Sequence, residues 1–476
     1  MAYRYFKLLP GILANMIPMK RGKSASTCLF LILVTPMFVL FSATLASASG
    51  NINGDRGDPG FNPIDANATN TTVNLYRNLK FVSGNELLFG HQDTTLVGVD
   101  ANGSTWYFNP NRSDVKTITG SYPAVYGYDI GGIDLDTWEN SSTPIGAWFH
   151  ARLQHIVPDV IAAFDRGGVI TLSWHCWNFA TGGTFYDTNG SVVPKILPGG
   201  ALHDDLTAAL DRIAKLFGNL VDSKNRSIPI LFRPWHECNI DAFWWCLKYC
   251  TPDEYKELYQ FTVHYLKDIK GVHNFLYVFS PDKPVFAISK DDYLECYPGD
   301  NYVDVLALDS YGGLDNTPTG PYMTWKYETR RSLATIVDLA NSKGKVAALS
   351  EVGPSNGLSF TNDSHWFVDQ LLDLVKNDRE ASQIAYCLVW ADQGLDGFWV
   401  PYPGQRNVQD FIDFYNDPYT VFQNDLMNTT MYQDRSIPSY SASPAFQLNI
   451  ILQAMNWGMF TCIIVIYWKK GMPHER

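Results

Sequence analysis

Apolar residues between about residues 65 and 440 gather in short runs, and most runs end in polar or aromatic side chains. Strands that are buried on both faces of a parallel sheet give such nearly continuous apolar runs. We therefore predict eight buried strands, which are Glu86–His91, Tyr122–Asp129, Gly168–His175, Ile228–Glu237, Asn274–Ser280, Val303–Tyr311, Lys345–Glu351 and Ile384–Trp390.

Helical patterns separate most of these runs. Apolar residues recur at steps of three and four in Asp204–Leu220, and Thr251, Pro252 and Glu254 predict the start of a helix with a capping box. Further amphipathic stretches are Trp325–Ala340 and Phe367–Val375. Eight alternating strands and helices predict a single (β/α)8 TIM barrel of the α/β class. The alternative is a doubly wound open sheet, which usually carries a Gly-rich first turn that this chain lacks.

Both ends of the chain carry a hydrophobic segment. A basic region, an apolar run and small residues make residues 1–48 typical of a signal peptide, with an uncleaved anchor as the alternative. Residues 49–64 are interpreted as a linker and residues 65–440 as one catalytic domain. Residues 446–468 precede two lysines and are either a membrane-spanning helix or a tail that packs on the barrel.

Composition narrows the class of partner. The net charge is −12 and no dense Lys/Arg run lies in the middle of the chain, which argues against nucleic acid. The 14 tryptophans lean slightly toward carbohydrate, because aromatic faces suit sugar rings. Sequons for N-glycosylation predict a secreted glycoprotein, and their asparagines are Asn67, Asn70, Asn102, Asn111, Asn140, Asn189, Asn225, Asn362 and Asn428.

The cysteines agree with secretion. Two of the eight lie in the terminal hydrophobic segments, and an even number remains for disulfides in an oxidising compartment. Cys246 and Cys250 are close enough in sequence to pair with each other or to cross-link one loop, but the sequence does not determine the pairing. The six are Cys176, Cys238, Cys246, Cys250, Cys296 and Cys387.

Chemically active residues close most of the predicted strands. In a (β/α)8 barrel the functional residues lie at the carboxyl ends of the strands. A barrel with only a structural role would have little reason to end so many strands in this way. The residues are His91, Asp129, Trp174-His175, Arg233 to Glu237, Asp309 to Tyr311, Glu351 and Trp390.

Two carboxylates stand out among them. Glu237 ends the fourth predicted strand and Glu351 ends the seventh, so the two face each other across the barrel mouth. Cleavage of a glycosidic bond uses one protonated and one ionised carboxyl group. Arg233 and Tyr311 are suited to pair with Glu351, and His175 and His236 are suited to bind the acid or a sugar hydroxyl. We therefore predict a glycoside hydrolase.

Four motifs together resemble glycoside hydrolase family 26, chiefly endo-β-1,4-mannanases. They are Phe89-Gly90-His91-Gln92-Asp93, Arg233-Pro234-Trp235-His236-Glu237, Tyr297-Pro298-Gly299-Asp300 and Glu351-Val352-Gly353. The resemblance covers most of residues 80–405. It implies a retaining double displacement through a covalent glycosyl-enzyme, no metal or other cofactor, and β-mannan or galactomannan as the substrate.

The resemblance also implies roles for individual residues. Glu237 corresponds to the acid/base and Glu351 to the nucleophile. The residues that correspond to the subsite around the cleaved bond are His175, Arg233, His236, Tyr311 and Trp390. We add three tryptophans to the predicted substrate-binding residues, namely Trp174, Trp244 and Trp245.

The segment after Glu237 departs from the family pattern. Ala242 stands where an aromatic residue of the active site is usual, and Ile240 stands where glycine is usual. A stacking platform beside the cleaved bond is therefore missing, or Phe243 supplies it. The alternatives within the family are a β-1,3-xylanase and a mixed-linkage β-glucanase.

Two readings lie outside the family. Histidine and aspartate residues at strand ends suggest a metal-dependent hydrolase, but no His-x-His pair is present. An inactive carbohydrate-binding protein is disfavoured because both glutamates are retained. We expect a monomer outside the cell that acts on a polysaccharide and binds no nucleic acid. If the C-terminal segment spans a membrane, it would tether the enzyme to the cell surface.

Overall fold

Parallel strands close into a barrel in the computed structural model, which describes residues 61–134, 144–312, 321–426 and 431–434. Within these residues, eight strands follow one another in chain order around the ring, and the last pairs with the first. This confirms the predicted (β/α)8 barrel. The strands are β1 (Leu87–Gln92), β4 (Val125–Asp129), β5 (Val169–Trp174), β6 (Ile230–Pro234), β7 (Phe275–Phe279), β8 (Val305–Gly312), β9 (Val346–Pro354) and β10 (Tyr386–Val389).

Three further strands were not predicted. β2 (Val97–Val99) and β3 (Thr105–Tyr107) form an antiparallel hairpin in the connection after β1. β11 (Thr420–Val421) runs parallel to the start of β1. These strands are two or three residues long, too short for a periodic pattern to reveal them.

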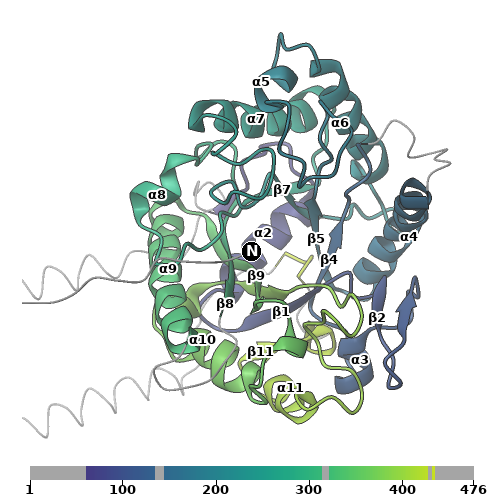
Figure 1. Ribbon diagram of the computed structural model, residues 1–476, viewed down its shortest axis with the longest axis vertical. Coiled ribbons are helices and arrows are strands. Elements are labelled where there is room, and N and C mark those ends of the chain that lie inside the picture. Colours follow the sequence, from purple (N-terminus) through teal and green to yellow (C-terminus); the bar gives the residue numbers. More distant parts are fainter. Residues whose placement is uncertain (1–60, 135–143, 313–320, 427–430, 435–476) are drawn as a thin grey trace, which may run out of the picture. The chain divides into compact units, whose positions relative to one another are not determined.

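Helices ring the barrel (Figure 1). α7 begins with the predicted capping box of Thr251 and Glu254. The predicted stretch Phe367–Val375 begins as a π-helical turn, Trp366–Leu372. The helices are α2 (Asn70–Val82), α3 (Asp114–Thr119), α4 (Pro144–Asp165), α5 (Val193–Ile196), α6 (His203–Phe217), α7 (Pro252–His264), α8 (Lys290–Glu295), α9 (Pro321–Lys343), α10 (Asp373–Lys376), α11 (Val408–Tyr415) and α12 (Gln423–Leu426). Shorter helical turns are Tyr265–Ile269, Leu358–Phe360 and Ala381–Gln383.

The core has two layers because side chains alternate along each strand. In β6, Leu231 belongs to the cluster that fills the barrel, whereas Ile230 and Phe232 belong to the cluster between the strands and the helices. Arg233 follows Leu231 by two residues and therefore points to the same side, at the carboxyl end of the strand. Strand alternation thus brings Arg233 to the barrel mouth.

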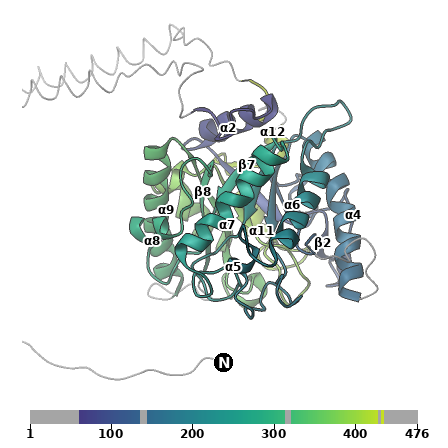
Figure 2. The ribbon, with the colours of Figure 1, turned by 90° about the horizontal axis from the view of Figure 1, so that it is seen from above.

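Helix α2 covers the opposite end of the barrel (Figure 2). Its side chains Leu75, Leu79 and Val82 are at most 1% exposed and join the apolar cluster inside the barrel. The Thr69 side chain caps the helix by accepting from the Thr72 amide. The amino ends of the strands are therefore sealed, and the carboxyl ends remain for the site.

One disulfide, Cys238–Cys296, forms among the described residues. Cys246 and Cys250 do not pair with each other. Instead their thiols donate to backbone oxygens, Cys246 to Glu237 O at 3.3 Å and Cys250 to Trp245 O at 3.4 Å. The disulfide joins the residue directly after Glu237 to the end of α8.

In the described residues, no helix combines the length and the apolar character needed to cross a membrane. The predicted signal peptide at residues 1–48 and the hydrophobic segment at 446–468 lie outside the described residues. The boundaries proposed for these segments remain predictions.

Candidate active site

Glu237 lies just beyond β6, on a turn with an unusual backbone. Trp235 and Glu237 both have a left-handed φ of 54°, a conformation that residues with side chains rarely adopt. Hydrogen bonds fix the turn. The Glu237 amide donates to Ser280 O at 2.8 Å, and Trp235 O accepts from the Tyr255 hydroxyl at 2.6 Å. Contacts from other elements therefore set the direction of the Glu237 side chain.

Glu351 lies in β9 and is 4% exposed. Its Oε1 accepts a hydrogen bond from Arg233 Nη2, and its Oε2 accepts one from the Tyr311 hydroxyl at 2.7 Å. Arg233 also donates through Nη1 to Asp309 Oδ2 at 2.7 Å. Both oxygens of Glu351 thus act as acceptors, which is the hydrogen-bonding pattern of a carboxylate.

The two glutamates converge on one point. One carboxyl oxygen from each of Glu237, Asp309 and Glu351 lies within 4.8 Å of the others. Carboxyl groups of retaining glycosidases are about 5–5.5 Å apart, whereas those of inverting enzymes are about 6.5–9.5 Å apart. The short separation favours a retaining arrangement, in which one carboxylate attacks the sugar directly.

The charges around Glu237 favour its protonated form. Burial raises the pKa of Glu237 well above its usual value, and the negative charges of Asp309, Glu351 and Asp282 raise it further, while Arg233 opposes them. Burial opposes the charge on Arg233, but Asp309 and Glu351 outweigh it and raise the pKa of the guanidinium. Arg233 therefore remains a fixed positive charge among the carboxylates.

Arg233 also bears on metal binding. Three clustered carboxylates are a donor set that a cation could use, but the Arg233 guanidinium already bonds to Asp309 and Glu351. The positive charge that a metal ion would bring is thus supplied by a side chain. The sequence-based expectation of a site without metal stays a prediction.

Two histidines and Asp129 form a hydrogen-bonded network beside Glu237. His175 Nδ1 is 2.7 Å from Asp129 Oδ2, and the Nε2 atoms of His175 and His236 are 3.1 Å apart, so one ring donates to the other. Burial, assisted by the positive charge of Arg233 and by His175, lowers the pKa of His236 well below its usual value. The His236 ring is therefore neutral. Trp390 is half-buried and meets His175 edge-on, with centroids 5.7 Å apart.

The structure corrects the expectation for three tryptophans. Trp174, Trp244 and Trp245 are all 0% exposed, so none of them reaches a substrate in this conformation. Each indole N–H is bonded inside the protein, as in the 2.9 Å bond from Trp174 to Asp134 Oδ1 and the 2.8 Å bond from Trp245 to His236 O. The three rings support the histidines and the Glu237 turn from behind.

Other expectations need correction as well. His91 is fully buried, and its Nδ1 lies 3.0 Å from Thr94 Oγ1, so it belongs to the core rather than to the site. Phe243, the predicted replacement for the missing platform, is 4% exposed and stacks on Trp245 with centroids 4.7 Å apart. Phe243 therefore presents almost no surface to a sugar.

Two residues near the carboxylates were missed from the sequence. The first is Asp282, which follows β7. Its backbone is held by the side chain of Asn239, which donates to Asp282 O and accepts from the Asp282 amide, each at 2.8 Å. The available signal was the place of Asp282 two residues after Ser280, where a predicted strand ends. Tyr186 lies in the connection after β5, where no periodic pattern pointed to it.

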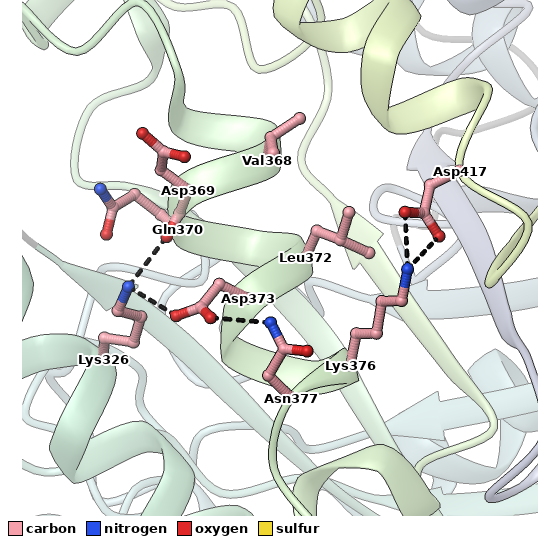
Figure 3. A pocket seen from close by; sticks show the side chains of 9 residues that line it. All are labelled: Lys326, Val368, Asp369, Gln370, Leu372, Asp373, Lys376, Asn377 and Asp417. Carbon is pink, nitrogen blue, oxygen red and sulfur yellow. Dashed lines mark hydrogen bonds and ion pairs between the residues drawn. The ribbon is translucent and has the colours of Figure 1, made fainter.

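A depression on the surface is lined by Lys326 of α9, by residues between Val368 and Asn377, and by Asp417 (Figure 3). It has a volume of about 480 Å³. Its two lysines are already paired, Lys326 with Asp373 at 2.9 Å and Lys376 with Asp417 at 2.7 Å. These ion pairs occupy both lysines of the lining, and we assign the depression no function.

Comparison with known proteins shows the family of this chain. Residues 64–368 match the sequence profile of glycosyl hydrolase family 26. The chain belongs to this family. A mannan endo-1,4-β-mannosidase from Bifidobacterium adolescentis is 33% identical over 389 residues, which are 76% of this chain but 37% of that protein. Another from Bacillus subtilis is 29% identical and covers 70% of this chain and 82% of the relative.

Solved structures of family members share the fold. A modular endo-β-1,4-mannanase from Cellulomonas fimi has a TM-score of 0.70 and 39% sequence identity, covering 78% of this chain and 79% of that one. The catalytic domain of an endo-β-1,4-mannanase from Bacillus sp. JAMB-750 has a TM-score of 0.69 and 36% identity, covering 79% and 97%. This family member is thus a glycosidase on a (β/α)8 barrel.

Proposed function

We propose that this family 26 glycosidase is a retaining endo-β-1,4-mannanase that cleaves β-mannan or galactomannan. The relatives and solved structures named above carry that activity in their names. The observation that carries the chemistry is the asymmetry between two converging carboxyl groups. Glu351 accepts two hydrogen bonds, whereas within the described part of the chain no side chain bonds the carboxyl of Glu237, whose pKa is raised.

In the first step, a Glu351 oxygen attacks the anomeric carbon of the sugar. Glu237 gives its proton to the glycosidic oxygen, the bond from that oxygen to the anomeric carbon breaks, and the leaving sugar departs with a new hydroxyl. Arg233 and Tyr311 hold Glu351 so that the oxygen that does not react remains hydrogen-bonded.

In the second step, Glu237 is a carboxylate and acts as a base. It takes a proton from water, the water oxygen attacks the anomeric carbon, and the bond to Glu351 breaks. Two inversions at one carbon retain its configuration. We assign His175, His236 and Trp390 to the walls around the reacting sugar, because His236 directly precedes Glu237 and the rings of His236 and Trp390 both meet that of His175.

Chemical rescue tests the nucleophile. Glu351→Ala should lose turnover of mannan, because no carboxylate remains to form the covalent intermediate. Sodium azide with a dinitrophenyl β-mannoside should restore cleavage and give the α-mannosyl azide, since azide enters from the vacated face. NMR of the wild-type enzyme should show β-mannose units released first. The matched control is Glu257→Ala at an exposed surface position, and this variant should keep full activity.

The assignment has clear contrary outcomes. An α-configured first product would refute the retaining geometry. Near-normal turnover by Glu351→Ala would remove the nucleophile from this position.

A β-1,3-xylanase or a mixed-linkage β-glucanase is the second candidate, favoured by one observation. Ala242 leaves no ring at a position where the family usually has one. Hydrolysis rates on galactomannan, β-1,3-xylan and mixed-linkage glucan decide between them. Faster release of xylose or glucose oligomers than of mannose oligomers would favour the second candidate.

We also propose that the enzyme acts as a monomer outside the cell, either free or tethered through the C-terminal segment. The asparagines of the seven sequons within the described residues are all exposed, namely Asn67, Asn70, Asn102, Asn111, Asn189, Asn225 and Asn362. A disulfide is present as well. Exposure is what glycosylation requires, and disulfides persist in oxidising compartments.

A further inference from the structure

Tyr186 is an aromatic side chain that the fold holds out into solvent near the reacting groups. It is 63% exposed. The connection that carries it is pinned by Asn178, which is 1% exposed and donates to Asp187 O at 2.6 Å and to Asn189 O at 2.8 Å. Because a buried amide fixes the loop on the far side of Tyr186, the ring is presented by a defined backbone.

The Tyr186 ring rests on a stack that leads to the active-site histidines. Its centroid lies 4.4 Å from that of Phe185 and 5.7 Å from that of Phe243. Phe185 in turn lies 4.6 Å from His175, and Phe243 lies 5.5 Å from His236. Tyr186 is therefore the outermost ring of an aromatic column that starts beside the acid.

The column occupies the side of the mouth that Glu237 serves. Phe243 belongs to the same loop as Glu237, and Ala242 beside it adds only a methyl group. Partial burial raises the pKa of the Tyr186 phenol, and the negative charges of Glu237 and Glu351 raise it further. The ring thus lies within electrostatic reach of both catalytic carboxylates.

We propose that Tyr186 is the stacking platform for the leaving-group sugar, the one whose oxygen receives the proton of Glu237. The proposal rests on the glycosidase mechanism given above. An exposed ring fixed on a buried column offers its face to the apolar side of a pyranose at little cost in side-chain entropy. Phe243 supports the platform, because its ring centroid lies 5.7 Å from that of Tyr186.

Two substrates separate this role from a structural one. A β-1,4-mannan oligosaccharide places a sugar on the leaving-group side, whereas dinitrophenyl β-mannobioside places none there. In Tyr186→Ala, kcat/KM for the oligosaccharide should fall by about three- to tenfold, the range that one aromatic contact contributes. For the aryl glycoside it should stay within about twofold, and Tyr186→Phe should behave like the wild type on both.

A second readout follows from the covalent intermediate. A sugar acceptor that attacks the glycosyl-enzyme must bind where the leaving group was, so Tyr186→Ala should form fewer transglycosylation products relative to hydrolysis. Tyr327 is similarly exposed, at 59%, but lies on α9. Tyr327→Ala serves as the control and should change neither kcat/KM nor the product ratio.

Each contrary result has a distinct meaning. Equal losses on both substrates in Tyr186→Ala would show a structural role and overturn the proposal, as would unchanged kinetics on the oligosaccharide. A wild-type enzyme that cleaves neither substrate would instead overturn the mannanase function, and the assignment of Tyr186 with it.

Discussion

Glu237 and Glu351 are identical side chains that the fold places in different surroundings. Glu351 receives hydrogen bonds from Arg233 and Tyr311. Glu237 faces Asp309, Glu351 and Asp282, whose negative charges add to burial in raising its pKa. Acid/base chemistry near neutral pH needs this separation of the two groups. The arrangement that serves catalysis also makes the ionised form of Glu237 unfavourable for the folded state.

Replacing Glu237 should therefore affect stability in a pH-dependent way. The raised pKa of Glu237 in the folded state gives stability that is present below its unfolded pKa, about 4.3, and is lost as pH rises through the folded value. Glu237→Gln should thus melt at a higher temperature than the wild type at pH 8, with a smaller difference at pH 4. Its kcat on mannan should fall by about 10²- to 10⁴-fold.

Thermal unfolding followed by circular dichroism at both pH values tests this prediction. Glu257→Gln, an exposed site on α7, serves as the control and should show no such dependence. A difference in melting temperature that is the same at pH 4 and pH 8 would contradict it.

The sequence predicted which residues end the strands more reliably than it predicted the direction in which their side chains point. Arg233, His236 and Glu351 could be placed because each follows an apolar run, and the structure brings them together. Trp174 could not be excluded, because the sequence alone does not show that it points to the helices. Asp282 was missed because it lies beyond the predicted end of β7, and contacts from Asn239 fix its place.

At the scale of elements, the Cys238–Cys296 disulfide links the Glu237 turn to the end of α8. The two cysteines are separated by 58 positions in the sequence, and the segment between them includes α7 and β7. A cross-link over a loop of this length lowers the entropy of the unfolded chain, an effect worth about 4 kcal/mol in the chain-entropy model. The disulfide is thus expected to stabilise the half of the barrel that carries the acid.

Removing the disulfide should test this effect. Cys296→Ser should lower the free energy of unfolding by about 2–4 kcal/mol in urea titrations. The half-buried free cysteine Cys250 offers the matched control, and Cys250→Ser should cost less. Reductant should destabilise the wild type but leave Cys296→Ser unchanged. Equal unfolding free energies for the wild type and Cys296→Ser would argue against the cross-link.

Elements with strong patterns were predictable and irregular ones were not. All eight barrel strands and the capping box of α7 agree with the sequence pattern. The short strand β11 depends on pairing with the distant residues Leu87 and Leu88, whereas β2 and β3 pair with each other in a hairpin too short to show a periodic pattern. The π-helical start of Trp366–Leu372 was likewise hidden, because its amphipathic pattern resembles that of an α-helix.

At the scale of the whole molecule, the surface carries seven exposed sequon asparagines within the described residues. Expression of the full chain in a eukaryotic secretory host should give protein in the medium whose mass falls after treatment with peptide-N-glycosidase F. Mass spectrometry of tryptic peptides should find the modification at these asparagines. Retention of unmodified protein inside the cells would contradict the proposed secretion.

The position of helix α2 determines how this domain can be joined to a fusion partner or a solid support. Phe61 O accepts a hydrogen bond from Arg77 of α2, and Met431 O accepts one from Asn78 of the same helix. The chain near both limits of the described residues therefore contacts the same helix, at the sealed end of the barrel. A fusion partner or solid support joined at either point leaves the mouth turned outward, so an immobilised enzyme retains access to insoluble polymer whichever end is used.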